Sequence, residues 1–211
     1  MTPAIAPPGG GAPPAAGANE PNVPGLHPGA NPLIEAAALG RPADLAALLA
    51  AGADVEAPHG VRGGTAYVWA CHQGQLQCAQ ALAAAGCDLT AAGNDGRTAL
   101  ICAASEGQTE VMKFLLTAEG GAVELLESRD EAGATAILAA CREGHLESAK
   151  MLRGAGGETA TVTTEGLTAL HAAAQGGHAK VLGWLLTAEG GAAELLDAQE
   201  ENGATAFSLL A

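Results

Sequence analysis

Cysteine and histidine are the residues of this 211-residue chain best suited to metal binding or nucleophilic catalysis. The five cysteines are separated by 7, 9, 15 and 39 residues, so none forms the C-x-x-C pair common in zinc sites. No histidine stands in an H-E-x-x-H spacing, and neither a G-x-S-x-G serine elbow nor a phosphate-binding P-loop occurs. The sequence therefore predicts no catalytic residue, no metal site and no cofactor, and the chain is not expected to be an enzyme.

The charge balance indicates which kinds of partner the chain could bind. It has 9 Lys and Arg against 23 Asp and Glu, a formal net charge of −14. This argues against binding to nucleic acid and to anionic membrane surfaces, both of which need clusters of basic side chains. A neutral or basic protein partner is compatible with it.

The cysteines and the N-terminal segment indicate the cellular compartment of the protein. An odd number of cysteines without a pairing pattern fits a reducing compartment better than a disulfide scaffold. Residues 1–32 contain no Lys or Arg and no uninterrupted apolar core, so they do not read as a secretory signal, and no apolar run reaches 18 residues. We expect an intracellular protein of the cytoplasm or nucleus.

Proline separates the first part of the chain from the rest. Residues 1–32 hold 9 of the 11 prolines and few side chains able to form a core. The expected structure for residues 1–30 is a disordered tail rich in Pro, Gly and Ala, with a linker favoured over a docking motif.

A repeat begins where the prolines end. Thr-Ala pairs recur at spacings of 33, 37, 33 and 37 residues, and Asn31-Pro32 fits the same position 34 residues before the first of them. Glycine recurs nine residues after each of the first five anchors, and leucine recurs seventeen residues after them. The anchors are Asn31, Thr65, Thr98, Thr135, Thr168 and Thr205; the glycines are Gly40, Gly74, Gly107, Gly144 and Gly177; the leucines are Leu48, Leu82, Leu115, Leu152 and Leu185. A period near 33 is typical of a stacked repeat architecture.

Each unit predicts a pair of helices. Thr or Asn at the anchor caps the first, Ala-rich helix, a contribution of roughly 1 kcal/mol, and the glycine ends that helix. The second helix carries an apolar stripe, as in residues 179–186, where Val181, Leu182, Leu185 and Leu186 share one face. One unit cannot bury its own stripe, whereas stacked units can.

These residues resemble the ankyrin repeat, whose pattern is roughly G-x-T-P-L-H-x-A-A-x-x-G-H. Residues 166–178, GLTALHAAAQGGH, match it best, and Gly52-Ala53-Asp54 also fits the family pattern. The resemblance implies an all-α ankyrin-repeat solenoid of stacked helix-turn-helix units with short hairpin-like turns, following the disordered N-terminal tail. It covers residues 31–211, with repeats at about 31–62, 63–95, 96–132, 133–165 and 166–202 and a partial repeat at 203–211.

Departures from the family pattern are informative. The histidine that in the family links neighbouring turns by hydrogen bonds occurs only at His171, so that network is expected to be partial. The 37-residue units carry near-identical insertions in residues 117–133 and 187–203, and Glu-Leu-Leu at 124–126 and 194–196 is expected to add a helical turn that covers the seam between units. The last unit stops after GATAFSLLA, which would leave Phe207, Leu209 and Leu210 partly uncovered; the chain is then a fragment of a longer array, or something else caps this end.

Repeat position also interprets the cysteines and aromatic residues. Cys71 and Cys141 stand six residues after their anchors, where other units have Ala104 and Ala174, so packing is favoured over reactivity. Cys78 and Cys102 take inward positions, and Cys87 takes the Ala position after Gly86. Trp184 and Phe114 share one position on the second helix and are expected in the core, as is Trp69 on a first helix; only exposure would make Trp69 a binding anchor.

The resemblance implies a scaffold or adaptor that binds a protein through the concave face and the turn tips, acting as a monomer. The alternative is a targeting or regulatory module of a larger enzyme, channel or ubiquitin-pathway protein. The tips are acidic, which fits either solvated loops that keep the chain soluble or a surface for a basic segment. Candidate partner-binding residues are His72, Gln73, Asn94, Asp95, Arg97, Ser105, Glu106, Asp130, Glu131, Arg142, Glu143, Glu165, Leu167, Gln175, Glu200, Glu201 and Asn202.

Overall fold

The computed structural model describes residues 31–60, 63–117, 125–187, 189–200, 203–206 and 208. Within these residues the chain forms ten α-helices, which follow one another in pairs, and no strand beyond isolated bridges. The first helices of the pairs are α1 (Pro32–Ala38), α3 (Ala66–His72), α5 (Ala99–Ser105), α7 (Ala136–Glu143) and α9 (Ala169–Gln175). The second helices are α2 (Pro42–Ala50), α4 (Leu76–Ala84), α6 (Thr109–Leu115), α8 (Leu146–Gly154) and α10 (Ala179–Leu185). The predicted disordered tail, residues 1–30, lies outside the described residues.

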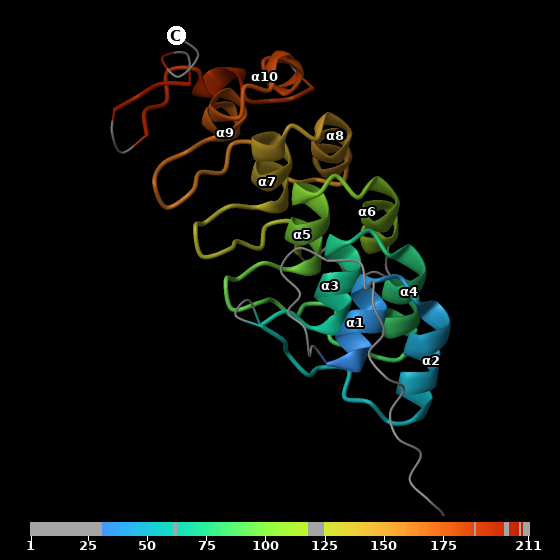
Figure 1. Cartoon of the computed structure of the whole chain (residues 1–211). Helices are drawn as coiled ribbons and strands as arrows, with labels where there is room; N and C mark the ends of the chain where they lie inside the picture. The colour runs from blue at the N-terminus through green and yellow to red at the C-terminus, as the bar shows by residue number, and fades with distance from the viewer. Residues whose placement is uncertain are drawn as a thin grey trace, which may run out of the picture.

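The pairs stack side by side from α1 and α2 at one end to α9 and α10 at the other (Figure 1). The first helices form an inner row, in which α3 lies between α1 and α5, and α7 lies between α5 and α9. The second helices form an outer row, in which α4 packs against α2 and α6. The predicted solenoid is confirmed, because each pair contacts its neighbours along the stack.

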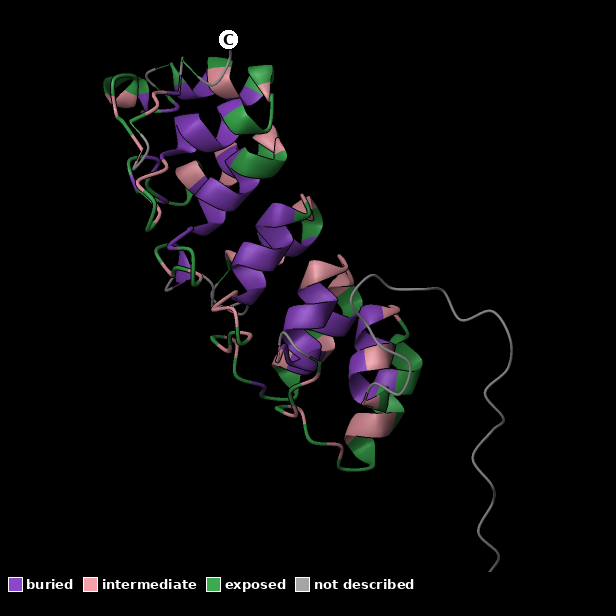
Figure 2. Cartoon of the chain, turned by 60° about the vertical axis from the view of Figure 1, so that its left-hand side comes forward, coloured by how far each residue is buried: buried purple, intermediate pink, exposed green. Residues whose placement is uncertain are grey.

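Small side chains allow the inner row to pack closely. All seven residues of α5 are buried, and six of the seven residues of α9 are buried, most of them alanines. In Figure 2 the buried residues run through the helices, while the loops are mainly intermediate or exposed. Because alanine adds little width to a helix, neighbouring inner helices approach closely enough to bury both of their flanks.

Capping at the anchors is less uniform than predicted. The side chains of Asn31, Thr98 and Thr168 accept hydrogen bonds from backbone amides of the helices they precede. Thr65 and Thr135 make no such bond, so for these two anchors the prediction is wrong. The Thr135 hydroxyl lies instead 3.4 Å from the hydroxyl of Thr161.

The outer row buries the predicted leucines in four of its five helices. Leu82, Leu115, Leu152 and Leu185 are each at most 1% exposed. Leu48 is only half-buried and Leu45 takes the core position of α2. Leu186 is 43% exposed, so its predicted place in the stripe is wrong: α10 ends at Leu185, and Trp184 fills the core in its stead.

Hairpin-like loops connect the pairs and project beyond the inner row (Figure 1). Each is closed by a backbone hydrogen bond across its base. These bonds run from His59 N to Gly64 O (3.2 Å), Gly93 N to Arg97 O (3.0 Å), Asp130 N to Ala134 O (3.1 Å), Thr163 N to Leu167 O (3.0 Å) and Glu200 N to Ala204 O (3.0 Å). Neighbouring loops are also joined, because Glu131 N donates to Asp95 O and Thr164 N donates to Ala132 O, both at 3.0 Å. The hairpins at residues 93–97, 130–134 and 163–167 therefore form a continuous row.

The two insertions differ in how they pack. Leu125 and Leu126 are 7% and 8% exposed and cover the core, as predicted for the first insertion; residues 118–124 lie outside the described residues. The second insertion forms a 3₁₀ turn at Ala193–Leu195, but its Leu196 is 41% exposed. The predicted covering role of Leu196 is thus wrong, since this turn exposes that side chain to solvent. Phe207, Leu209 and Leu210 lie outside the described residues.

Candidate partner-binding surface

The predicted contact residues lie along the loop row and at the ends of the inner helices, and together we call these positions the inner face. Exposure differs among them. Asn94, Glu106, Glu131, Arg142, Glu143, Glu165 and Gln175 are exposed. His72, Gln73, Asp95, Arg97, Asp130, Leu167 and Glu200 are partly exposed. Glu201 and Asn202 lie outside the described residues.

Two acidic residues of the inner face stabilise their own loops. One Asp130 carboxylate oxygen accepts from Ala132 N at 3.0 Å and from Ala134 N at 2.8 Å. Asp95 accepts from Arg97 N at 3.2 Å in the same way. These carboxylates replace water at amides that the tight turn would otherwise leave without an acceptor. Glu131, next to Asp130, and Glu165, in the following hairpin, are exposed, and their side chains make no such hydrogen bond within the described residues.

Ser105 was predicted to contact a partner, and its position in the structure contradicts this. Its side chain is buried, because Ser105 ends α5 and its hydroxyl donates to Cys102 O at 3.0 Å. The backbone carbonyl of Ser105 accepts from His145 of the next pair. Ser105 therefore supports the stack through these bonds and presents no hydroxyl to a partner.

Polar side chains to which the sequence analysis gave no role link each helix pair to the preceding pair. Ten residues after each Thr anchor from Thr65 to Thr168 stands Gln or His, and its side chain donates to the carbonyl at the end of the previous inner helix. The bonds of this carbonyl ladder run from Gln75 to Ala38 O (3.4 Å), Gln108 to His72 O (3.3 Å), His145 to Ser105 O (3.1 Å) and His178 to Arg142 O (2.9 Å). They satisfy carbonyls that a helix end leaves without an intrahelical donor. The recurrence of a polar residue at this position was the signal in the sequence.

His171 makes the link that the family resemblance implies. Its Nδ1 accepts from Thr168 N at 3.3 Å, so Nε2 carries the proton and donates to Ala204 O in the following hairpin at 3.2 Å. At the corresponding positions Val68, Ile101 and Leu138 offer no such group. The network is therefore partial, as predicted.

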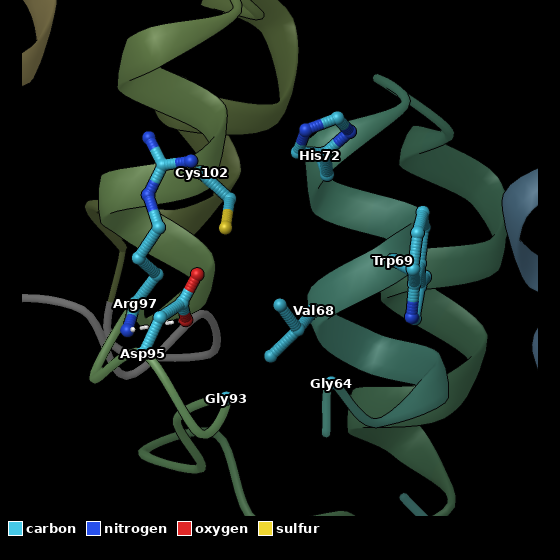
Figure 3. A pocket seen from close by; sticks show the side chains of 8 residues that line it. All are labelled: Gly64, Val68, Trp69, His72, Gly93, Asp95, Arg97 and Cys102. Atoms are coloured by element: carbon cyan, nitrogen blue, oxygen red, sulfur yellow. Dashed lines mark hydrogen bonds between the residues drawn. The ribbon is translucent and has the colours of Figure 1, made fainter. Parts of the chain in front are cut away.

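A small pocket opens on the inner face between the second and third pairs (Figure 3). Three predicted contact residues line it: His72, Asp95 and Arg97. The other lining residues were not predicted as contacts: Gly64, Val68, Trp69, Gly93 and Cys102. Figure 3 shows α3 supplying one wall and α5 with its hairpin the other. Because the two walls come from different repeats, only stacking creates the pocket.

Two N–H groups in the pocket wall are buried without a hydrogen-bond acceptor: Nε1 of Trp69 and Nε of Arg97. The Trp69 side chain packs in the core at 5% exposure, with its ring centroid 5.9 Å from that of His72. His72 in turn lies 3.5 Å from a carboxylate oxygen of Glu106. Buried donors without acceptors are costly and uncommon, and here both belong to one pocket.

The cysteines are buried, as the packing interpretation predicts. Burial raises the pKa of the Cys141 thiol to about 12. Burial, followed by the carboxylates of Glu56 and Asp88, raises the pKa of Cys87 to about 12. Since the thiolate is the nucleophilic form, neither thiol is activated at neutral pH. Within the described residues no group of three or more His, Cys, Asp or Glu side chains could hold a metal ion.

Sequence comparison identifies the architecture independently. A profile of ankyrin repeats in three copies matches residues 33–125 and 118–198. No curated protein matches the chain. Of the helices in the described part of the chain, none is long and apolar enough to span a membrane. The profile covers well over half of the sequence and agrees with the stacked helix pairs, the hairpin row and the His171 link, so the chain belongs to the ankyrin-repeat family.

Proposed function

We propose that the chain is a non-catalytic scaffold that binds a protein partner along its inner face. The observation that supports this most directly is the repetition of partly or fully exposed side chains at equivalent positions. Gln73, Glu106 and Glu143 stand at the same position of three consecutive inner helices, while Asn94 and Glu131 share a position in two hairpins. Stacking arranges such residues in lines, which suits an extended partner segment.

The charges of the inner face favour a partner segment with basic character. Glu106, Glu131, Glu143 and Glu165 are exposed there in a chain of net charge −14. Glu143 lies 3.0 Å from Arg142 and Glu106 lies 3.5 Å from His72, whereas Glu131 and Glu165 form no ion pair within the described residues. On the outer row Lys113 lies 2.6 Å from Glu110 and Lys150 lies 3.4 Å from Glu147. Long-range attraction by the inner face would mainly accelerate association.

The test compares two variants of the full chain with equal charge changes. The first replaces Glu106, Glu131, Glu143 and Glu165 by Gln on the inner face. The control replaces Asp44 by Asn and Glu110, Glu147 and Glu194 by Gln, all exposed positions away from the inner face. Partners captured from cell extract are compared by quantitative mass spectrometry, and association rates of a captured partner are then measured at low and high salt.

We expect the inner-face variant to associate at least about tenfold more slowly at low salt, with the difference shrinking as salt screens the charges. The control variant should bind like the unmodified chain. Equal rates for all three proteins would show that the acidic residues only keep the loops solvated. Equal slowing of both variants would indicate an effect of net charge without a defined face.

A further inference from the structure

The pocket between the second and third helix pairs contains a carboxylate with one oxygen left for an occupant. One oxygen of Asp95 accepts from the Arg97 backbone N–H at 3.2 Å. In Figure 3 the other oxygen points into the space between α3 and α5. Within the described residues no basic side chain forms an ion pair with this carboxylate, although Arg97 lines the same pocket. The pocket therefore favours an occupant that brings a hydrogen-bond donor.

The walls around this oxygen are mainly apolar. Helix α3 contributes the side chains of Val68 and Trp69, and α5 contributes Cys102 from the other side (Figure 3). All three residues are buried in the stack, so the positions of these walls are fixed by core packing. Methylene groups gain dispersion contacts against such surfaces while a polar tip reaches farther. The fitting occupant is thus an aliphatic stem that ends in a donor.

Size limits the end of that stem. The cavity has a volume of about 30 Å³. Since a water molecule needs roughly 10–15 Å³ measured in this way, the space holds about two water-sized groups. The last methylene and the ammonium nitrogen of a lysine side chain match this size. A guanidinium group has four heavy atoms in a rigid plane and exceeds it.

Charge separates an ammonium group from a neutral donor. Asp95 is an acid, Glu106 lies 3.5 Å from the lining residue His72, and the chain has a net charge of −14. Arg97 carries the one permanent positive charge among the lining residues and opposes a cation. Because Arg97 forms no ion pair with Asp95, the carboxylate keeps its attraction for an ammonium group.

This combination of residues occurs at one junction of the array. Gly64 and Gly93 leave the pocket open, since a Cβ on Gly64 alone would stand 3.2 Å from Nε1 of Trp69. Together with Asp95 they form a set that the later junctions lack. The corresponding residues at the three following junctions are Arg97, Asp130 and Ala132; Ala134, Thr163 and Glu165; and Leu167, Glu200 and Asn202.

We propose that this pocket binds the side chain of one lysine in the partner segment. The ammonium group donates to the remaining oxygen of Asp95, and the last methylene packs between Val68 and Cys102. The inference rests on the proposed function and adds a residue-level specificity to it: the acidic inner face attracts a basic segment, and the pocket selects lysine at one position of that segment.

The test titrates Nα-acetyl-lysine methylamide into the full-length, ¹⁵N-labelled chain and follows the tryptophan indole signals by NMR at about 0.15 M salt, where general charge attraction is screened. The chain has two tryptophans, of which Trp69 lines the pocket and Trp184 does not. Trp184 is therefore an internal control for unspecific binding. Trp69→Phe assigns the two signals.

Three further probes define the occupant. The norleucine analogue keeps the stem without the ammonium group, the arginine analogue keeps the charge on a larger head group, and alanine methylamide carries its ammonium group on the backbone. We expect a saturable shift of the Trp69 signal with the lysine probe and none for Trp184. Each of the other three probes should bind at least about fivefold more weakly, because each loses the charge-assisted bond or the fit of the stem.

Matched variants locate the binding charge. Asp95→Asn keeps an oxygen for the Arg97 N–H and should weaken binding of the lysine probe at least about fivefold. Glu165→Gln makes the same charge change in another hairpin, outside the pocket, and should leave binding unchanged. Arg97→Gln should leave binding equal or make it tighter, since it removes a positive charge from the wall.

Several results would overturn the proposal. Equal or non-saturating shifts of both tryptophans, or equal weakening by Asp95→Asn and Glu165→Gln, would show attraction by net charge without a pocket. Arginine or alanine probes that bind as tightly as the lysine probe would remove the selection of a lysine side chain. Because the titration needs no partner, its failure leaves the inner-face experiment standing. Failure of that experiment, with a saturable lysine shift, would remove the proposed function while supporting the pocket.

Discussion

At the scale of single residues, the stack depends on a glycine in each of the first four units that lies beneath a polar side chain of the next unit. Gly107 has a φ of 67°, which only glycine adopts without strain, and a Cβ there would stand 2.6 Å from Nδ1 of His145. His145 needs that position to reach the carbonyl of Ser105. One glycine thus ends a helix and also leaves room for the carbonyl ladder.

Replacing this glycine tests both roles. Gly107→Ala should lower the free energy of unfolding by about 2–3 kcal/mol, since a left-handed residue with a Cβ costs roughly 1–2 kcal/mol and the His145 bond contributes about 1 kcal/mol. Gly154→Ala is the matched control: Gly154 closes α8, and a Cβ there meets nothing within 4 Å. The control should be neutral or stabilising by up to about 1 kcal/mol. Urea denaturation followed by circular dichroism measures both, and an equal effect of the two substitutions would contradict the argument.

How well a residue's role could be predicted depends on what determines it. The burial of Cys71 and Cys141 followed from their repeat position, because alanine fills the same position elsewhere. The predicted capping by Thr65 and Thr135 was wrong, because such a hydrogen bond depends on the side-chain rotamer and on tenths of an ångström in the donor–acceptor distance. The pocket that Trp69 and Arg97 both line was not visible in the sequence, because its two walls come from different repeats.

At the scale of elements, the hairpin at Asp130 divides two roles between adjacent acids: one supports the turn and its neighbour remains available for binding. Asp130 accepts from two loop amides, one of which belongs to buried Ala134, while Glu131 is exposed. The hairpins were predicted correctly as elements, because Gly two residues before each Thr and polar residues between helices are turn signals. The sequence did not predict which acid supports the turn and which stays exposed, because Asp and Glu both suit a solvated turn.

Substitutions at the two adjacent positions separate the role in the turn from the exposed role. Asp130→Ala should reduce the free energy of unfolding by about 2 kcal/mol, since two backbone donors lose their acceptor. Glu131→Ala removes the same charge one residue away and should change stability by less than about 0.5 kcal/mol. Thermal and urea denaturation provide the comparison, and Asp130→Asn should recover part of the loss through its remaining oxygen. Similar destabilisation by both alanine substitutions would mean that charge, and not the turn geometry, is what matters.

At the scale of the whole molecule, stability should vary along the stack, because each pair contacts only its neighbours. Helix α7 buries six of its eight residues and packs against α5, α8 and α9. Helix α2 buries only Leu45 and has an outer-row neighbour on one side among the described helices. The middle of the array is therefore expected to open far less often than this end.

Hydrogen exchange measured by mass spectrometry should resolve that gradient. Amides in α2 should exchange at least about 30-fold faster than those in α7, which corresponds to roughly 2 kcal/mol of opening free energy. Leu45→Ala, which removes the one buried side chain of α2, should accelerate exchange in α1 and α2 and leave α7 and α9 unaffected. Leu152→Ala in α8 is the matched substitution within the stack and should accelerate exchange in the pairs on both sides. Acceleration spread evenly over all helices by either variant would show that the repeats share one cooperative core, which a stack held together by nearest-neighbour contacts does not have.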